Sequence, residues 1–317
     1  MTKKDLRIIY MGTPDFAVAP LKALIDNAFN IVAVVTGADK PQGRGRKIVP
    51  TPVKEFAVEH DIPVLQPEKL KDPDFVEQLR SYKADLQIVV AFRMLPEIVW
   101  AMPKLGTFNL HAALLPQYRG AAPINWAVIN GETMTGVTTF FIDKDIDTGR
   151  IMLQREVPIL DADNCGTIHD KLMETGSELV VETVNRLIAN DMKPIEQESL
   201  IKPGTTLKHA PKIFKEDCRL DFNKDATSIR NLVRGLSPYP AAFTTIKVKG
   251  KEMSLKVFAA DAEITEKHPV PGTLETDNKK FIKISCQNGW LYLTDVQLEG
   301  KKRMKIVEFL RGIILEN

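Results

Sequence analysis

The stretch GTFNLHAALLPQYRGAAP, residues 106–123, is the part of the sequence around which the rest of the chain is organised. It begins as a strand-like run, so Asn109 and His111 share one face while Leu110 points into the other layer. Two prolines and a glycine then exclude an immediate helix and predict a loop of fixed shape. An imidazole beside an amide at a strand end is typical of active sites in open α/β sheets. A buried His and Asn that satisfy backbone groups would leave the same pattern.

Length and composition limit the possible classes of protein. A chain of 317 residues predicts two domains, and its 44% hydrophobic and 26% charged content is typical of a globular protein. No apolar run reaches the roughly 18 residues of a membrane span, and no signal-peptide core follows Met1, so we expect a cytoplasmic protein. The formal net charge of +2 excludes a protein that is basic throughout, but it permits a local basic patch.

Three cysteines, Cys165, Cys218 and Cys286, lie far apart in the sequence and form no Cys-x-x-Cys or Cys/His cluster. Such spacing suggests neither a disulfide framework nor a zinc site. We therefore expect reduced, packed thiols and no bound metal.

Repeated strand and helix patterns in the first half predict a parallel sheet. The apolar runs at residues 7–11, 31–35 and 86–91 are continuous rather than alternating, which is typical of parallel strands covered on both faces. Thr13 is the expected N-cap of the first helix, with Pro14 in its first position. The turn before that helix has a single glycine, which argues against dinucleotide or P-loop phosphate binding.

A basic segment follows the second predicted strand. It contains no acid between residues 40 and 54, whereas it carries the bases Lys40, Arg44, Arg46, Lys47 and Lys54. Glycines make such a loop mobile and arginines supply forked donors for phosphate, so contact with nucleic acid is one interpretation. A solvated basic loop is the other. Thr51 and Pro52 then predict the start of the next helix.

The acidic stretch at residues 143–149 invites comparison with a calcium-binding loop. The spacing excludes this, because the sixth position is Thr148 and the twelfth is Gln154, where glycine and glutamate are required. We predict instead that a strand terminus places Asp147 beside His111 of another strand. Asp143 could equally be a solvated turn acid, as could Asp145.

The composition changes after the long helix expected at residues 167–189. We predict a first domain at residues 1–190, a linker at 191–211 and a second domain at 212–317. Alternating segments at 243–249, 253–259, 281–286 and 290–297 suggest a small antiparallel barrel or sheet in the second domain. Two basic clusters, at residues 247–251 and 301–305, are either solubilising surfaces or binding patches.

Several motifs together resemble the 10-formyltetrahydrofolate-dependent formyltransferases. They are Asn109-Leu110-His111, Leu114-Leu115-Pro116, Arg119-Gly120-Ala121-Ala122-Pro123 and Asp147-Thr148-Gly149. Within this family, the chain is similar to the members that act on methionyl initiator tRNA, in three further segments: residues 12–17, the basic loop from Gly43-Arg44-Gly45 to Pro52-Val53-Lys54, and residues 229–240. Two positions depart from the usual pattern: Ala113 replaces a serine, and Phe222 replaces a tryptophan.

The resemblance implies an α/β protein with a Rossmann-like parallel-sheet domain followed by a small OB-like β-barrel that binds tRNA. It implies transfer of a formyl group from 10-formyltetrahydrofolate, as co-substrate, to the amino group of methionyl initiator tRNA. The implied catalytic residues are Asn109, His111 and Asp147, with Asn109 and His111 as donors to the formyl oxygen and Asp147 orienting His111 and stabilising its imidazolium form. The implied folate-binding residues are Phe92, Arg93, Met94, Leu95, Ala113, Leu114, Leu115 and Pro116.

The tRNA contacts that the resemblance implies are Lys40, Arg44, Arg46, Lys47, Lys212 and Arg303, in a protein expected to be a monomer. A formyltransferase for a small amine, such as an amino-sugar nucleotide or glycinamide ribonucleotide, is the alternative, and it would not need the basic loop. A non-catalytic tRNA-binding protein is a third interpretation, and it leaves the Asn109, His111 and Asp147 trio unexplained.

Overall fold

The computed structural model describes residues 2–42 and 47–315. Contacts along the chain divide it into two compact units, each built from separate segments. Unit 1 comprises residues 1–120, 134–158 and 169–209, and unit 2 comprises residues 121–133, 159–168 and 210–317. The compact units are not continuous in sequence, so they do not correspond segment by segment to the predicted domains at 1–190 and 212–317. The predicted domain boundaries stay a prediction.

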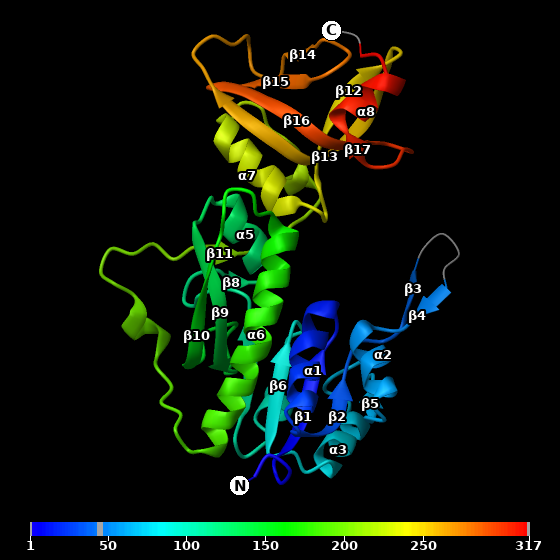
Figure 1. Cartoon of the computed structure of the whole chain (residues 1–317). Helices are drawn as coiled ribbons and strands as arrows, with labels where there is room; N and C mark the ends of the chain where they lie inside the picture. The colour runs from blue at the N-terminus through cyan, green and yellow to red at the C-terminus, as the bar shows by residue number, and fades with distance from the viewer. Residues whose placement is uncertain (1, 43–46, 316–317) are drawn as a thin grey trace. The chain divides into compact units, whose positions relative to one another are not determined.

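Unit 1 is built on a seven-stranded sheet in the order β10-β9-β7-β6-β1-β2-β5 (Figure 1). The strands are β1 (Arg7–Gly12), β2 (Asn30–Val35), β5 (Val64–Leu65), β6 (Leu86–Val90), β7 (Thr107–His111), β9 (Met134–Phe141) and β10 (Ile151–Pro158). The five strands from β7 to β5 are parallel, which confirms the predicted parallel sheet. The two strands at the other edge are antiparallel, β9 to β7 and β10 to β9.

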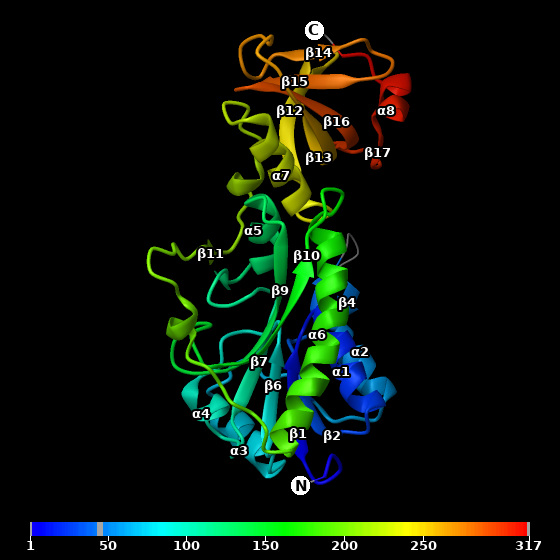
Figure 2. The same cartoon turned by 60° about the vertical axis from the view of Figure 1, so that its left-hand side comes forward.

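Helices cover both faces of this sheet (Figures 1 and 2). One face packs against α3 (Pro73–Ser81) and α4 (Glu97–Trp100) in a core formed by Ile9, Met11, Val35, Phe75, Val76, Leu79, Val89 and Val99. The other face carries α1 (Val18–Asp26) and α6 (Cys165–Ile188). Leu110 points to α6, where a Cβ on Gly176 would lie 2.8 Å from its Cδ2. Its neighbours Asn109 and His111 therefore project to the α3 side.

Helix starts show where local sequence rules hold. Thr51 caps α2 (Pro52–Glu59) by accepting a hydrogen bond from the Lys54 backbone N–H at 3.1 Å, which confirms the predicted start. The predicted Thr13 cap is wrong. Pro14 is extended, with ψ at 174°, and the chain enters the 3-10 turn η1 (Asp15–Ala17) before α1 begins at Val18.

The remaining elements of unit 1 are short. They are the hairpin strands β3 (Lys40–Gln42) and β4 (Lys47–Val49), the strand β8 (Arg119–Gly120) and the 3-10 turn η2 (Gln197–Leu200). The strand β11 (His209–Ala210) lies where unit 1 ends and the last segment of unit 2 begins. None of the helices in the described ranges is both long enough and apolar enough to span a membrane.

Unit 2 is an antiparallel sheet in the order β12-β13-β16-β15-β14, with β17 paired to β16, as predicted for the C-terminal part. The elements are η3 (Glu216–Cys218), α7 (Ala226–Leu236), β12 (Ala242–Val248), β13 (Lys251–Ile264), β14 (Leu274–Thr276), β15 (Ile282–Cys286), β16 (Gly289–Leu298), β17 (Met304–Lys305) and α8 (Ile306–Gly312), together with α5 (Pro123–Ile129). Ile229 and Val233 of α7 and Phe309 of α8 are buried in its core. Phe222, which replaces the usual tryptophan, packs against that core.

The arginines on α7 explain why residues 159–168 belong to unit 2. Arg230 forms a bidentate ion pair with Asp161, at 2.7 and 2.8 Å, and this hydrogen-bonded pairing lowers the pKa of the Asp161 carboxyl. Arg234 donates to the backbone carbonyls of Asp163 and Leu160, at 2.7 and 2.8 Å. The arginines of the 229–240 motif therefore serve the packing of unit 2 itself.

Candidate active site

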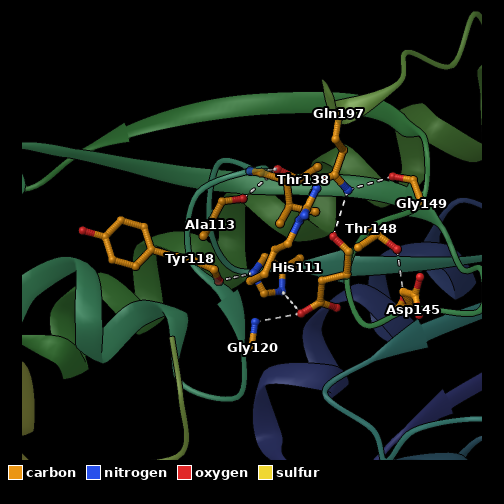
Figure 3. A network of polar contacts seen from close by, with 12 residues as sticks. His111, Ala113, Tyr118, Gly120, Thr138, Asp145, Thr148, Gly149 and Gln197 are labelled. Atoms are coloured by element: carbon orange, nitrogen blue, oxygen red, sulfur yellow. Dashed lines mark hydrogen bonds and ion pairs between the residues drawn. The ribbon is translucent and has the colours of Figure 1, made fainter. Parts of the chain in front are cut away.

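His111 is the last residue of β7 and is buried, with 5% of its surface exposed. Its Nε2 lies 2.9 Å from the backbone carbonyl of Tyr118 (Figure 3). A carbonyl can only accept a hydrogen bond, so Nε2 carries the proton of the neutral ring. The other ring nitrogen, Nδ1, lies 3.8 Å from Oδ2 of Asp147, which is an ion-pair distance rather than a hydrogen bond.

Asp147 reaches His111 by a route that the sequence analysis did not predict. Because β9 is antiparallel to β7, its last residue, Phe141, pairs with Phe108 at the opposite end of β7 from His111. Residues 142–150, which we call the Asp147 loop, carry the carboxylate to the imidazole. The prediction of a strand terminus at this position is therefore wrong, although Asp147 does lie beside His111.

The glycine of Asp-Thr-Gly is required by close packing where this loop returns to the sheet. A Cβ on Gly149 would lie 1.7 Å from the backbone oxygen of Phe141, so no larger residue fits without movement of the backbone. Thr148 donates to Oδ1 of Asp143 at 2.8 Å and to the Asp145 carbonyl at 3.1 Å. Asp143 and Asp145 are thus exposed turn residues that support the loop, which agrees with the simpler of the two interpretations.

Two hydrogen bonds fix the position of Asp147. The Gly120 N–H donates to its Oδ2 at 2.9 Å, and the Gln197 side chain donates to its backbone carbonyl at 2.9 Å. Its φ of 56° is in the left-handed region, which is uncommon outside glycine. The carboxylate is therefore preorganised beside the imidazole.

Asn109 lies on the same face of β7 as His111, two residues earlier. Its side-chain oxygen Oδ1 is buried and has no hydrogen-bond partner among residues 2–42 and 47–315. A buried polar atom without a partner is costly, and in native proteins it calls for an explanation such as a ligand. Asn109 thus has hydrogen-bonding capacity that the described part of the fold does not use.

The predicted folate-binding segment after β6 is only partly buried. Leu95 belongs to the core on the α3 side, whereas Met94 is 71% exposed. The guanidinium of Arg93 stacks near the Phe92 ring and donates to the backbone carbonyls of Pro67 and Glu68. Arg93 therefore ties this loop to residues 67–68.

The second predicted folate-binding segment, residues 113–116, is held mainly through its backbone. The Thr138 hydroxyl donates to the Ala113 carbonyl at 2.6 Å and accepts from the Leu115 N–H at 3.2 Å. The Gln154 amide donates to the Leu115 carbonyl at 2.8 Å and to Thr138 at 2.9 Å. Pro116 is buried, and the side chain of Leu114 fills the space over Gly136. The turn thus keeps a fixed shape without a hydroxyl at position 113.

The predicted tRNA-binding residues of the basic segment differ in how much of each the structure describes. Lys40 is exposed on β3, Arg44 and Arg46 lie outside the described residues, and of Lys47 only the backbone is described. Lys54 is not a free cation, because its Nζ donates to Asp39 at 2.6 Å and to Gln66 at 2.8 Å.

In unit 2, Lys212 is exposed with its Nζ 5.4 Å from the centre of the Phe214 ring. Arg303 forms a bidentate ion pair with Asp295, at 3.0 and 2.9 Å, and stacks over Phe258. Burial opposes ionisation of Asp295, but the hydrogen bonds from Arg303 and Lys305 outweigh it and lower the pKa of the carboxyl. One edge of the Arg303 guanidinium is therefore already in use.

The three cysteines are free thiols, as predicted. Burial raises the pKa of Cys165 to about 12 and that of Cys286 to about 11, and it also raises the pKa of Cys218. Thiols that remain protonated at neutral pH are poor nucleophiles, so they are structural residues.

Gln197 is the residue of this site that sequence reasoning missed. It is fully buried and it contacts the Asp147 loop, yet it lies in the segment predicted to be a linker. Its surroundings are set by contacts with residues about 50 and 78 positions away, so no local motif indicates its role.

Two family models cover most of the chain. The model described as formyl transferase matches residues 6–184, and the model described as formyl transferase, C-terminal domain, matches residues 212–313. The class of protein defined by the fold is therefore a formyl transferase. The solved structure of HypX from Aquifex aeolicus in complex with tetrahydrofolic acid has the same fold, with a TM-score of 0.62 and 21% identity. The match covers 96% of this chain and 47% of that longer chain.

Comparison with curated relatives indicates which family of formyl transferases the chain belongs to. The methionyl-tRNA formyltransferase of Bacteroides thetaiotaomicron is 55% identical over 319 residues, covering 100% of this chain and 98% of the relative. That of Flavobacterium johnsoniae is 51% identical over 310 residues, covering 98% and 97%. The chain belongs to the methionyl-tRNA formyltransferase family.

Proposed function

We propose that this protein transfers the formyl group of 10-formyltetrahydrofolate to the free α-amino group of methionyl initiator tRNA, giving N-formylmethionyl-tRNA for translation initiation. The observation that carries the proposal is the meeting of His111 and Asp147 at the end of β7, with the unpartnered amide of Asn109 on the same strand face. The proposal places the reaction in the cytoplasm and assigns it to a monomer.

The folate supplies an activated one-carbon acyl group: the amine nitrogen adds to the formyl carbon, the bond from that carbon to N10 then breaks, and N10 takes up a proton so that tetrahydrofolate leaves. Negative charge grows on the formyl oxygen in this step, and the amine loses a proton. In our assignment Asn109 donates its amide N–H to that oxygen. The unpartnered Oδ1 fits a bound ligand, because the same amide can then accept from a donor of the folate.

His111 and Asp147 divide the remaining tasks. Nε2 of His111 is committed to the Tyr118 carbonyl, so Nδ1 is the ring nitrogen left for the reacting groups. The resemblance implied that His111 donates an N–H to the formyl oxygen. Because Nε2 is already engaged, His111 can do so only when its ring is protonated on Nδ1. Asp147 orients that nitrogen and accepts the proton of the amine, directly or through a water molecule. Catalytic hydrogen bonds often shorten when substrates bind, so 3.8 Å is compatible with these roles.

The folate ring is assigned to two segments, residues 92–95 and 113–116. In the second segment, Thr138 and Gln154 fix the backbone through hydrogen bonds to Ala113 and Leu115. Recognition through the backbone tolerates side-chain change, which is why Ala113 in place of serine does not argue against the assignment.

The tRNA is assigned to the basic segment around Lys40, Arg44, Arg46 and Lys47 and to Lys212 and Arg303 in unit 2. These residues supply the phosphate contacts that a polyanionic substrate needs. Lys54 is not included, because its ammonium is already paired with Asp39.

The proposal is tested by offering the purified chain 10-formyltetrahydrofolate with methionyl initiator tRNA, methionyl elongator tRNA and an amino-sugar nucleotide in parallel reactions. Formylation of the initiator tRNA, with little reaction of the other amines, is the expected result. Reaction of the sugar nucleotide alone would establish the small-amine alternative. Binding of tRNA without formyl transfer to any amine would establish the non-catalytic one.

A further inference from the structure

Gln197 stands at the centre of a hydrogen-bonded frame in unit 1. Its side chain is fully buried and makes four hydrogen bonds. The oxygen Oε1 accepts from Nε and Nη2 of Arg119 at 3.0 and 2.7 Å. The nitrogen Nε2 donates to the backbone carbonyls of Asp147 at 2.9 Å and Gly149 at 2.8 Å, and Figure 3 shows Gln197 above the loop that contains Gly149.

These bonds close a ring around the carboxylate of Asp147. Arg119 donates to the Gln197 side chain, and Gln197 donates to the Asp147 backbone carbonyl. The N–H of Gly120, the residue after Arg119, donates to the Asp147 side chain at 2.9 Å. The residue before Arg119, Tyr118, holds His111 through its carbonyl. Residues 118–120 thus set the positions of both the imidazole and the carboxylate.

The turn that carries Gln197 is itself anchored to the sheet. Ile195 and Ile151 exchange two backbone hydrogen bonds, at 2.9 and 2.8 Å, so the chain at 195 pairs with the start of β10. Gln197 therefore projects from a fixed backbone into the Asp147 loop. A position that is fixed on both sides can hold a loop in a strained conformation.

We propose that Gln197 is a positioning residue for the reaction, acting through the main chain of Asp147. It touches none of the reacting groups assigned above. The inference rests on the proposed function, because it assumes that the Asp147 carboxylate acts on the substrate amine.

The hydrogen-bond partners of the Gln197 side chain require an amide at this position. Only a side chain with an acceptor oxygen and an NH2 group can accept from both N–H groups of Arg119 and donate to two carbonyls together. In Gln197→Glu, a carboxylate oxygen would face the carbonyls of Asp147 and Gly149, which repels them. In Gln197→Leu, the Arg119 guanidinium and both carbonyls lose their partner in a buried place.

Release of the loop is expected to lower kcat rather than substrate affinity. A displacement of about 1 Å in a catalytic group costs on the order of a hundredfold in rate. We expect Gln197→Leu to lower kcat about 10- to 100-fold, with little change in the KM for 10-formyltetrahydrofolate.

Gln154 is the matched control, because it is also a glutamine whose Nε2 donates to a backbone carbonyl in unit 1. It holds Leu115 in the turn assigned to the folate and does not touch the Asp147 loop. Gln154→Leu should therefore raise the KM for the folate, and Gln197→Leu should lower kcat. The same response in both variants would mean a general packing defect and would overturn the proposal.

A double-mutant cycle supplies a readout that a merely structural role would not move. If Gln197 acts through Asp147, then Gln197→Leu added to Asp147→Asn should cause little further loss of kcat. Losses that multiply would overturn the inference. Should Gln197→Leu fail to fold by circular dichroism, Gln197→Glu and Arg119→Lys disturb the same frame from its two sides and carry the cycle.

The two levels of the proposal fail in different ways. An inactive wild-type chain refutes the proposed function. An Asp147→Asn variant with normal turnover refutes the role assigned to Asp147, and with it the positioning role of Gln197, but leaves formyl transfer standing. An active wild type and an impaired Asp147→Asn variant, combined with normal kcat in the folded Gln197 variants, refutes only the positioning role.

Discussion

The Asp147 loop and the basic segment at residues 40–54 both belong to unit 1, and they hold their polar side chains in different ways. In the Asp147 loop, hydrogen bonds from Gln197 and Gly120 fix both the backbone and the carboxylate. In the basic segment, Asp39 and Gln66 hold the Lys54 ammonium, and the backbone of β3 pairs with that of β4. Lys40 and Ile48 farther along are exposed.

The difference shows which property each task needs. Proton transfer depends on distances of a few tenths of an ångström, so it requires a preorganised group. Attraction of a polyanion depends on charge and reach, and it tolerates a loosely held side chain. The fold therefore concentrates hydrogen bonds where chemistry is proposed, and leaves charge at the exposed surface.

The largest effect is expected from loss of the catalytic pair itself. His111→Ala or Asp147→Asn should lower kcat by roughly two to four powers of ten, because each removes proton transfer or charge stabilisation. Rapid-quench or steady-state assays of formyl transfer measure it, with circular dichroism as the folding control. A folded His111→Ala protein of near-normal activity would contradict the claim that the preorganised Asp147 loop and His111 carry the chemistry.

A smaller effect on both stability and rate is expected where the Asp147 loop packs on the sheet. Gly149→Ala places a methyl group against the Phe141 carbonyl and should destabilise the protein by about 1–3 kcal/mol, because the backbone must move. Thermal unfolding measures the loss. Gly312→Ala is the control, since no atom of residues 2–42 or 47–315 lies within 4 Å of a Cβ there, and its melting temperature should not fall. Equal behaviour of the two variants would contradict the packing argument.

The basic segment should respond through ionic strength rather than through kcat. Arg44→Ala should weaken use of methionyl-tRNA several-fold and lower the slope of log(kcat/KM) against log salt by about one, because one phosphate contact is lost. Lys54→Met should leave that slope unchanged, since Lys54 is paired with Asp39. Plots of kcat/KM for tRNA from low to moderate salt test both. A slope altered by Lys54→Met would add this lysine to the set of tRNA contacts.

The smallest effect concerns pH at the base of the same segment. Hydrogen bonds from Lys54 and then Gln66 lower the pKa of the Asp39 carboxyl below its usual 3.8. A depressed folded-state pKa gives a stabilisation that is present above the unfolded value and is lost as the pH falls through the folded value. Asp39→Asn should therefore melt slightly below the wild type at neutral pH and together with it in acid. A difference in melting temperature that does not shrink as the pH is lowered through the acid range would contradict the assignment.

The local features of this protein follow from its sequence alone. Continuous apolar runs gave the parallel strands, Thr51 gave a helix start, and strand alternation placed Asn109 and His111 on one face. These features follow from neighbours within a few residues, so periodicity and capping rules reach them. Thr13 is the exception, because its helix is preceded by a 3-10 turn.

The way the site is closed depends on contacts between segments far apart in the chain. The reversal of β9 sends the Asp147 loop along an unexpected route, Gln197 comes from a supposed linker, and the Lys54 ammonium is engaged by an aspartate 15 residues earlier in the chain. Each of these outcomes depends on which distant backbone groups need a partner once the chain is compact. Local periodicity carries no information about such partners, because the same side chain is free or bound according to what the fold brings beside it.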